Sequence, residues 1–397
     1  MMATRTLHRY PLLISVLLAL TGLTVVGQIY IPIPILTEIT QHFNNNKNMA
    51  GWVSSAFSIG YSAGFLLSGP LSDRFGRRLV MLTGFIFFLL FTVLVGFCSN
   101  FSQLLTLRVL QGLAASCYPP IILAYLNEKL SSTLKSRAIS FMSLGFLTAS
   151  IVAQLYAIKF SHYGFNTIEL ALVPVYFVSI ILIYFVVHRD KESNQVEEHN
   201  KTTLFDIYRK IPGILFEKNL KWLYLSTLCT LSALVAFYIM MDESYGKKFA
   251  IMGIEPFTTR LIVLPVMFLS LLAPWIIQKI GAISLVRWSF LIAAAGLIVA
   301  SVTVSFGSAW GLLFASIIFI GGRAFSVPSL VGVIAVLAEQ QYRGTAISLY
   351  TFVLFVGASI GPLIAHLLLM MNYSISLLIL AFIAGLPVLL TLFIRVC

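Results

Sequence analysis

The segment GPLSDRFGRRLVMLTGFIFFLLFTVLVGFC, residues 69–98, places a short basic stretch directly before a long apolar run. That run, residues 79–98, has the roughly 20 residues that an α-helix needs to cross a bilayer. A second mostly apolar run, residues 47–69, comes just before the basic stretch. The pattern predicts two membrane-spanning helices joined by a tight, positively charged loop.

The composition of the whole chain extends this prediction. Hydrophobic residues make up 59% and charged residues only 10% of the 397 residues, whereas charged residues are about a quarter of an ordinary globular protein. Barrel-like alternation of apolar and polar residues is absent, and helices satisfy their own backbone hydrogen bonds in lipid. We therefore predict an all-α membrane protein. Twelve spans are expected, at residues 10–36, 47–69, 79–98, 102–126, 137–159, 169–188, 220–241, 257–278, 283–305, 309–337, 343–370 and 374–394.

The longest polar segment predicts a division of the chain into two halves. We expect an N-terminal six-helix bundle over residues 1–188, a cytoplasmic linker over 189–219 and a C-terminal six-helix bundle over 220–397. The linker contains a candidate interfacial helix near Leu204–Leu215.

Faint internal similarity also indicates two related halves, as in transporters built from repeats. The Gly112 and Pro119 spacing of the fourth span recurs at Gly321 and Pro328 in the tenth. In the same order, RAIS opens the fifth span and RGTAIS opens the eleventh.

The net charge of +12 is spread over short loops, which favours membrane topology over a nucleic-acid partner. Cytoplasmic loops carry an excess of Lys and Arg, and most of these residues fall on the side of the N-terminus. We therefore expect both termini to be cytoplasmic, in a bacterial inner membrane. The opposite side receives only Lys47, Lys159, Lys247, Lys248 and Arg260.

Patterns typical of enzymes are missing. The four cysteines, Cys98, Cys117, Cys229 and Cys397, have neither metal-ligand spacing nor a disulfide framework. The sequence has no nucleotide-binding loop, zinc pattern or nucleophile elbow. We predict a protein that is not an enzyme, that needs no cofactor or metal, and that draws its energy from a proton gradient.

The loop GPLSDRFGRR is the most specific motif. Gly69 permits close helix approach, Gly76 permits a tight turn, and Asp73 can accept from helix-end amides or pair with a basic residue. The loop closely resembles the cytoplasmic signature of the major facilitator superfamily, which implies two pseudo-symmetric six-helix bundles that alternate access to a central cavity. We also expect the protein to function as a monomer. The candidate residues of a conformational latch are Gly69, Asp73, Arg74, Gly76, Arg77 and Arg78.

Two further segments resemble proton-coupled members of that superfamily. RVLQG, at Arg108, resembles their fourth-span motif, and GQIYIPIP, at Gly27, resembles the first span of the bacterial drug:proton antiporters. Gln28 stands where those antiporters often have an acid. The Gly-Pro of their fifth-span motif is missing, whereas GASIGP, residues 357–362, occurs in the eleventh span.

The charges within the spans predict a basic cavity, because no acidic residue falls near a predicted span centre whereas Arg108 and Arg323 lie inside spans. The candidate proton-coupling residues are Arg108, Asp242, Glu243, Glu38 and His366. The candidate substrate-binding residues are Arg323, Arg108, Gln28, Tyr30, Tyr118, Gln154, Tyr238 and Tyr350.

The function that we predict first is proton-coupled export of small organic molecules by antiport. The basic cavity favours anionic or carboxylate-rich substrates such as a siderophore. One alternative is multidrug efflux of lipophilic compounds. Another is proton-coupled uptake of an organic anion or nutrient, which the missing fifth-span Gly-Pro and the lack of a membrane-centre acid favour.

Overall fold

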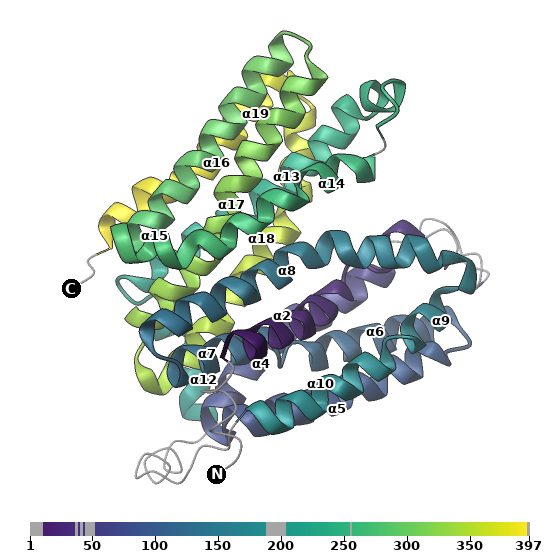
Figure 1. The fold of residues 1–397 in the computed structure, drawn as a ribbon, viewed down its shortest axis with the longest axis vertical. Coiled ribbons are helices and arrows are strands. Elements are labelled where there is room, and N and C mark those ends of the chain that lie inside the picture. The colour runs from purple at the N-terminus through teal and green to yellow at the C-terminus, as the bar shows by residue number, and fades with distance from the viewer. Residues whose placement is uncertain are drawn as a thin grey trace. The chain divides into compact units, whose positions relative to one another are not determined.

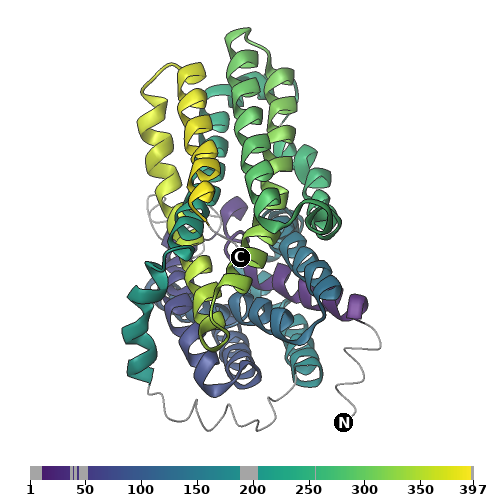
Figure 2. The same ribbon diagram turned by 90° about the vertical axis from the view of Figure 1, so that its left-hand side faces the viewer.

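The computed structural model describes residues 11–35, 39, 43, 52–187, 204–254 and 256–394, and over these residues every regular element is a helix (Figures 1 and 2). Contacts along the chain divide it into two compact units. Unit 1 runs to Ile211 and also includes Glu339–Leu349; unit 2 comprises Pro212–Ala338 and Tyr350–Cys397.

Unit 1 contains the first half of the predicted spans. Its closest helix pairs are α4 with α6 and α2 with α8. The elements are α2 (Pro11–Gly27), η1 (Ile33–Ile35), α4 (Trp52–Phe75), α5 (Arg77–Gly96), α6 (Phe101–Ala115), α7 (Pro119–Lys129), α8 (Ser132–Phe160), η3 (Ser161–Tyr163), α9 (Phe165–Leu170), α10 (Val173–Val186) and η5 (Gln340–Tyr342).

Unit 2 contains the second half, and in it α16 packs against both α17 and α19. Two helices, α12 (Leu204–Leu215) and α18 (Arg343–Leu369), belong partly to each unit. The other elements are α13 (Leu220–Ile251), α14 (Pro256–Met267), η4 (Phe268–Leu272), α15 (Ala273–Ile280), α16 (Ala282–Ser305), α17 (Ala309–Leu337), α19 (Tyr373–Leu390) and η6 (Thr391–Phe393).

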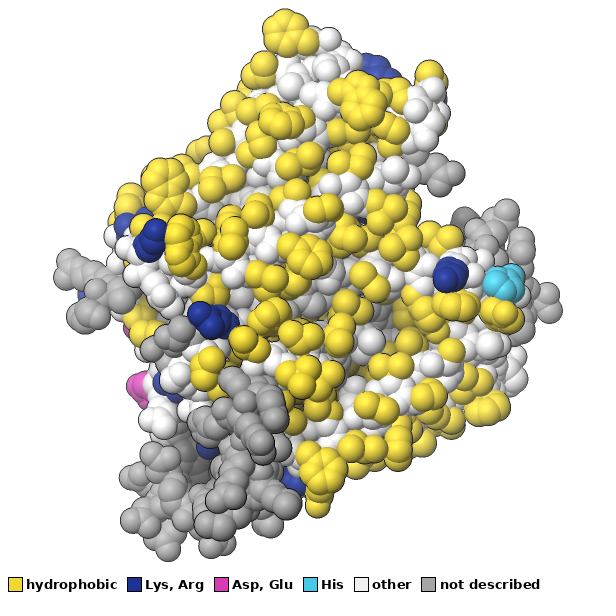
Figure 3. Space-filling view, in the orientation of Figure 1, with side chains coloured by type: hydrophobic (Ala, Val, Ile, Leu, Met, Phe, Trp, Pro, Cys, Tyr) yellow, Lys and Arg dark blue, Asp and Glu magenta, His cyan; other side chains and the backbone are white. Residues whose placement is uncertain are grey.

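The helices have the length and surface of membrane spans. Among the described residues, ten helical segments are long and apolar enough to cross a bilayer. Residues Leu12–Gly27 form a shorter apolar helix, and α4 adds a helix of 24 residues. Large apolar side chains such as Phe185 and Phe382 are exposed, and apolar side chains cover much of the face seen in Figure 3. The protein is therefore an all-helical integral membrane protein, as predicted.

Several predicted spans are broken at prolines. The fourth span divides into α6 and α7, where Pro119 opens the second helix because a proline is tolerated in a first turn. The sixth divides into α9 and α10, which has a proline in its first turn. The predicted linker helix at Leu204–Leu215 is present as α12, whereas linker residues 188–203 lie outside the described part.

The cysteines that the structure describes are not joined in disulfides; Cys98 and Cys229 are buried and Cys117 is partly buried. Cys397 lies outside the described residues.

Candidate functional site

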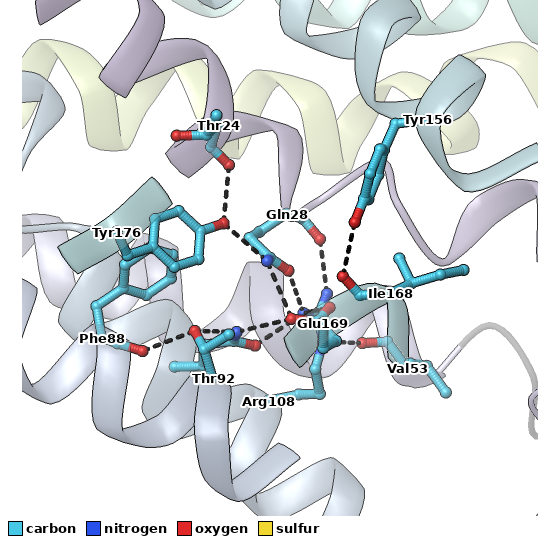
Figure 4. Close-up of polar contacts among 11 residues, drawn as sticks. Thr24, Gln28, Val53, Phe88, Thr92, Arg108, Tyr156, Ile168, Glu169 and Tyr176 are labelled. Carbon is cyan, nitrogen blue, oxygen red and sulfur yellow. Dashed lines mark hydrogen bonds and ion pairs between the residues drawn. The ribbon is translucent and has the colours of Figure 1, made fainter. Parts of the chain in front are cut away.

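A buried cluster of charged and amide side chains lies inside unit 1 (Figure 4). At its centre, Arg108 and Glu169 are both fully inaccessible to solvent, and their closest nitrogen and oxygen atoms are 3.5 Å apart. Gln28 and Gln111, also fully buried, contact both charges. A guanidinium and a carboxylate are costly to bury, so the cluster needs well-placed partners.

Helix α6 places Arg108 against α4. The helix starts at a cap in which Asn100 accepts a hydrogen bond from the Gln103 amide, at 2.8 Å. Farther along, a Cβ atom at Gly112 would overlap the backbone carbonyl of Phe57, so only glycine allows the two helices to come this close. The Arg108 Nε atom consequently donates to the Val53 carbonyl at 3.4 Å, and its guanidinium lies 4.7 Å from the centroid of the Phe57 ring.

The first span supplies a carbonyl to Arg108 because a proline interrupts its helix. Helix α2 ends at Gly27, and the residue four positions after Gln28 is Pro32, which has no amide hydrogen to donate back. The Gln28 carbonyl instead accepts from Arg108 Nη2 at 2.7 Å. The proline of the GQIYIPIP motif thus leaves a backbone acceptor for the buried cation.

The Gln28 amide bridges the two charges. Its oxygen accepts from Arg108 Nη1 at 3.0 Å, and its nitrogen donates to Glu169 Oε2 at 3.0 Å and to the Tyr176 hydroxyl at 2.9 Å. The hydroxyl of Tyr176 in turn donates to the Thr24 carbonyl. A carboxylate in place of Gln28 could make none of the donations, so the amide suits a site that already holds one acid.

Gln111 repeats this bridge from α6. Its oxygen accepts from Arg108 Nη1 at 2.8 Å. Its nitrogen donates to Glu169 Oε2 at 3.3 Å and to the Thr92 hydroxyl at 2.9 Å. Both amides therefore turn their acceptor toward the arginine and their donor toward the carboxylate.

This direction of hydrogen bonds fits an ionised Glu169. A carboxylate accepts only, whereas a carboxylic acid also has a hydrogen to donate. Rotating either amide to accept that hydrogen would turn its NH₂ group toward Arg108, which has only donors. Protonation of Glu169 would therefore disturb this alternation of donors and acceptors.

Glu169 is the functional candidate that the sequence analysis missed. The residue lies in the short helix α9, near one end of its membrane segment, Phe165–Val186, so its position in the sequence did not single it out. Glu169 lies near a span end, as the sequence indicated, but it is fully buried and offsets the charge of Arg108 in unit 1. Its proximity to RVLQG in space could not be inferred from residues 61 positions apart.

Arg323 lies in unit 2 without such partners. The side chain is 2% exposed, and its Nη2 atom makes one long hydrogen bond, 3.4 Å, to the Cys229 carbonyl. Over the described part of the chain, its Nε and Nη1 atoms have no hydrogen-bond partner. The expected buried cation is therefore present in this unit.

The other predicted proton-coupling residues do not join the cluster. Asp242 pairs with Arg260 at 2.7 Å, and both side chains are partly exposed. Glu243 and His366 are exposed on α13 and α18. Glu38 lies outside the described residues.

The other predicted substrate-binding residues are distributed over both units. In unit 1, the hydroxyl of Tyr118 donates to the Leu18 carbonyl, and Gln154 donates to the Ser150 carbonyl within α8. Tyr30 follows α2 and is partly buried. In unit 2, Tyr238 lies beside Arg260, and the buried Tyr350 hydroxyl has no partner among the described residues.

Asp73 binds the start of α18 within unit 1. Its carboxylate accepts from the Gly344 amide at 3.1 Å and from the Thr345 amide at 2.7 Å. These are first-turn amides, which have no partner inside their own helix and carry the positive end of its dipole. The contact with helix-end amides that the sequence suggested is therefore present.

The rest of the loop motif supports Asp73. Arg77 pairs with Asp73 and, at 2.9 Å, with Glu128. Gly76 has φ 89°, a backbone conformation that favours glycine. Gly69 faces Ser348 and Thr345. Arg74 lies over Phe75, and Arg78 donates to the Tyr184 carbonyl.

A hollow of about 450 Å³ in unit 2 lies apart from these charges. It is lined by residues of α14, η4, α16 and α17, and it includes none of the predicted substrate-binding residues. Gly321 and Phe325, which line it, are each two residues from Arg323. At about 100° per residue they point away from the guanidinium. No group of three or more His, Cys, Asp or Glu among the described residues could hold a metal ion.

Comparison with known proteins identifies relatives that transport solutes. Residues 18–362 match the Major Facilitator Superfamily. Over 112 residues, the chain is 38% identical to the 4-hydroxybenzoate transporter PcaK of Pseudomonas aeruginosa, covering 28% of this chain and 25% of that protein. Over 160 residues, it is 29% identical to the arabinose-proton symporter of Escherichia coli K12, covering 40% and 34%. The chain thus spans about a quarter to a third of the length of these relatives.

The whole fold also matches a solved structure. The human organic anion transporter MFSD10 (TETRAN) superposes with a TM-score of 0.76, covering 96% of this chain and 99% of that one at 13% sequence identity.

Proposed function

Because this chain belongs to the major facilitator superfamily, we propose that it is a proton-coupled symporter that takes up a small organic solute. Membership of this family makes it a membrane transporter and not an enzyme. The observation that carries the proposal is the buried cluster in which two amides connect Arg108 with Glu169. Within it, Glu169 carries the coupled proton.

The proton acts on the cluster through charge and hydrogen bonding together. Protonation of Glu169 removes the negative charge opposite Arg108 and adds a donor where Gln28 and Gln111 already donate. Both changes destabilise the arrangement that holds α2, α6 and α9 together. A proton that stabilises one arrangement over another shifts the population of the states that face the two sides of the membrane.

Uptake rather than export is supported by the relatives. One of them is named a proton symporter. Proton-driven export, which we expected first from the sequence, rested on the resemblance to drug:proton antiporters, and Gln28 lacks the acid that those antiporters often have there. Export of a siderophore has no further support from the residues of the cluster.

The loop motif has a separate role in this proposal. Asp73 and its neighbours form the latch, and the bonds to Gly344 and Thr345 form and break during the transport cycle. The distribution of Lys and Arg supports a cytoplasmic location for both termini. In the proposal, the protein acts as a monomer in a bacterial inner membrane.

Transport into proteoliposomes tests this function. Labelled 4-hydroxybenzoate and arabinose are the probes, each offered with the lumen either more alkaline or more acidic than the outside. Symport predicts that at least one probe accumulates when the outside is acidic, whereas antiport predicts accumulation only with the reverse gradient. If neither probe accumulates under the acidic-outside gradient, the proposal fails.

Two variants locate the proton in the same assay. Glu169→Gln should abolish gradient-driven accumulation while preserving exchange of labelled for unlabelled probe across the membrane. Asp242→Asn is the matched control, because Asp242 is paired with an arginine in unit 2 but is partly exposed, and it should keep gradient-driven uptake. Gradient-driven uptake that survives in Glu169→Gln but is lost in Asp242→Asn would contradict Glu169 as the residue that carries the proton.

A further inference from the structure

Arg323 lies too deep in its helix to reach water at the membrane surface. It is fourteen residues from each end of α17, Ala309 and Leu337, which is about 21 Å at 1.5 Å per residue. Long basic side chains near the end of a span extend to the interface, but one at the middle of a span of this length does not. Its position therefore needs another explanation.

The surroundings of Arg323 do not neutralise its charge. The acids that the structure describes in unit 2 are occupied elsewhere or exposed. Asp242 pairs with Arg260, Glu217 accepts from two amides at the start of α13, and Glu243 is exposed. A buried cation without a counter-charge is strongly unfavourable. Ionisable residues placed inside membrane proteins at such cost mark substrate or ion sites by default.

The side chains that do contact Arg323 are aromatic. Its guanidinium carbon lies 5.1 Å from the ring centroid of Phe290 and 5.3 Å from that of Phe319. Both phenylalanines are fully buried, and the ring of Phe237 packs against Phe319 with centroids 5.0 Å apart. Cation–π contacts reduce the cost of the charge, but the Nε and Nη1 atoms have no acceptor among the described residues. Arg323 thus combines free donors with aromatic neighbours.

We propose that Arg323 binds the carboxylate of a small aromatic monoacid, and that this acid is the transported solute. An arginine fork binds a carboxylate with two parallel, charge-assisted hydrogen bonds. The single cation matches one negative charge, and Phe290 and Phe319 provide apolar walls for a flat ring. The inference rests on the proposed function, because it names the solute that the symporter carries, but it depends on residues of unit 2 and not on the cluster around Glu169.

Equilibrium binding to the purified, detergent-solubilised protein tests this inference without transport. The probes are benzoate, its uncharged analogue benzamide, and cyclohexanecarboxylate, which keeps the charge but not the aromatic ring. Calorimetry in chloride-free buffer should detect benzoate binding that is stronger than that of cyclohexanecarboxylate, and no binding of benzamide. Equal binding of benzoate and benzamide would overturn the charge recognition, and equal binding of the two acids would overturn the aromatic part.

Variants connect the binding to Arg323. Arg323→Gln should weaken benzoate binding at least about tenfold, as expected when charge-assisted hydrogen bonds are lost. Arg323→Lys keeps the charge but not the forked guanidinium, so its benzoate affinity should lie between those of the unaltered protein and Arg323→Gln. Arg260→Gln is the matched control from the same unit and should bind benzoate as the unaltered protein does. Unchanged benzoate binding by a folded Arg323→Gln protein, or no benzoate binding by the unaltered protein, would refute the proposal.

The Glu169→Gln protein separates this inference from the proposed function. If it binds benzoate normally but no longer couples to the proton gradient, both proposals are supported. If Arg323→Gln abolishes benzoate binding while gradient coupling survives in Glu169→Gln, the aromatic acid stands and the coupling site is wrong. If Arg323→Gln still binds benzoate while Glu169→Gln loses gradient coupling, the coupling site stands and the anion site is wrong.

Discussion

The two buried arginines of this protein have opposite environments. In unit 1, Arg108 makes hydrogen bonds to two amides, two backbone carbonyls and one carboxylate. In unit 2, Arg323 makes one long bond to a carbonyl and lies over two phenylalanine rings. Both guanidinium groups are nearly or fully inaccessible. Burial alone therefore does not say what a charge inside a membrane protein does.

The difference separates a charge completed by the protein from one that is left for a ligand. Arg108 has its counter-charge in Glu169, and in the proposed mechanism a proton changes this site by neutralising that carboxylate. Arg323 has two nitrogen atoms without acceptors among the described residues, and in the proposed mechanism an anion supplies those acceptors. Coupling and recognition would then reside in different units, each with a distinct chemical signature.

The largest loss of stability should follow removal of Arg108, the buried charge that has a counter-charge. Arg108→Met would leave Glu169 buried without its cation, and we expect a loss of about 3–5 kcal/mol in the free energy of unfolding. Thermal or denaturant unfolding in detergent would measure it. The double variant Arg108→Met with Glu169→Met should recover much of that loss, because it leaves no unpaired charge. Equal instability of the single and double variants would contradict the pairing.

Removal of the unpaired charge of Arg323 should change the free energy of unfolding in the opposite direction. Arg323→Met removes an unpaired cation and adds an apolar side chain of similar length, so the ligand-free protein should gain about 1–3 kcal/mol in unfolding free energy. The same unfolding assay provides the measurement. Destabilisation by this substitution would show that Arg323 has a protein partner, and the contrast between the arginines would disappear.

A third charge, Asp73, is a buried acid that backbone amides and Arg77 satisfy together. Asp73→Asn removes the negative charge at the start of α18, a contact worth about 1–2 kcal/mol at a partly buried helix terminus. We expect the maximal uptake rate to fall several-fold with little change in benzoate affinity. Asp242→Asn, at a partly exposed acid of unit 2 that pairs with Arg260, serves as the control. Uptake at the unaltered rate with normal expression would remove Asp73 from the latch.

The smallest effects should come from two tyrosine hydroxyls. Tyr176→Phe removes a group that accepts from Gln28 and donates to the Thr24 carbonyl, and it should cost about 1 kcal/mol. Tyr350→Phe, in unit 2, removes a buried hydroxyl with no partner among the described residues and should cost nothing or be slightly stabilising. Unfolding curves of the two variants, measured under the same conditions, provide the test. Equal losses of unfolding free energy in Tyr176→Phe and Tyr350→Phe would contradict the prediction.

The fold could be predicted largely from the sequence because lipid imposes simple rules on it. A run of about 20 apolar residues must be a helix, so each predicted span corresponds to a helical segment. The proline breaks at Pro119 and in the sixth span were not anticipated. Their cause was readable, since the residue before a proline tends to leave the helical conformation.

The candidate site was only half predictable. Arg108 and Gln28 were found because their motifs are local, and Arg323 because a charge in the middle of an apolar run is conspicuous. Glu169 was missed because its meaning depends on Gln111 and Arg108, which approach it only in the folded unit. The Pro32 that frees the Gln28 carbonyl was a visible signal, but nothing in the sequence indicated that an arginine would use it.

Helix α18 has a mechanical consequence for the transport cycle. Its first residues, up to Leu349, belong to unit 1, and from Tyr350 onward the same continuous helix belongs to unit 2. The backbone hydrogen bonds of a continuous helix resist bending. Helix α18 is therefore stiff where it passes from unit 1 to unit 2. Pro362, within the same helix, removes one backbone bond and softens the helix farther along. The amides that bind Asp73 therefore lie on the stiff first turn of α18, whereas the softened part, around Pro362, lies in the second half of the helix.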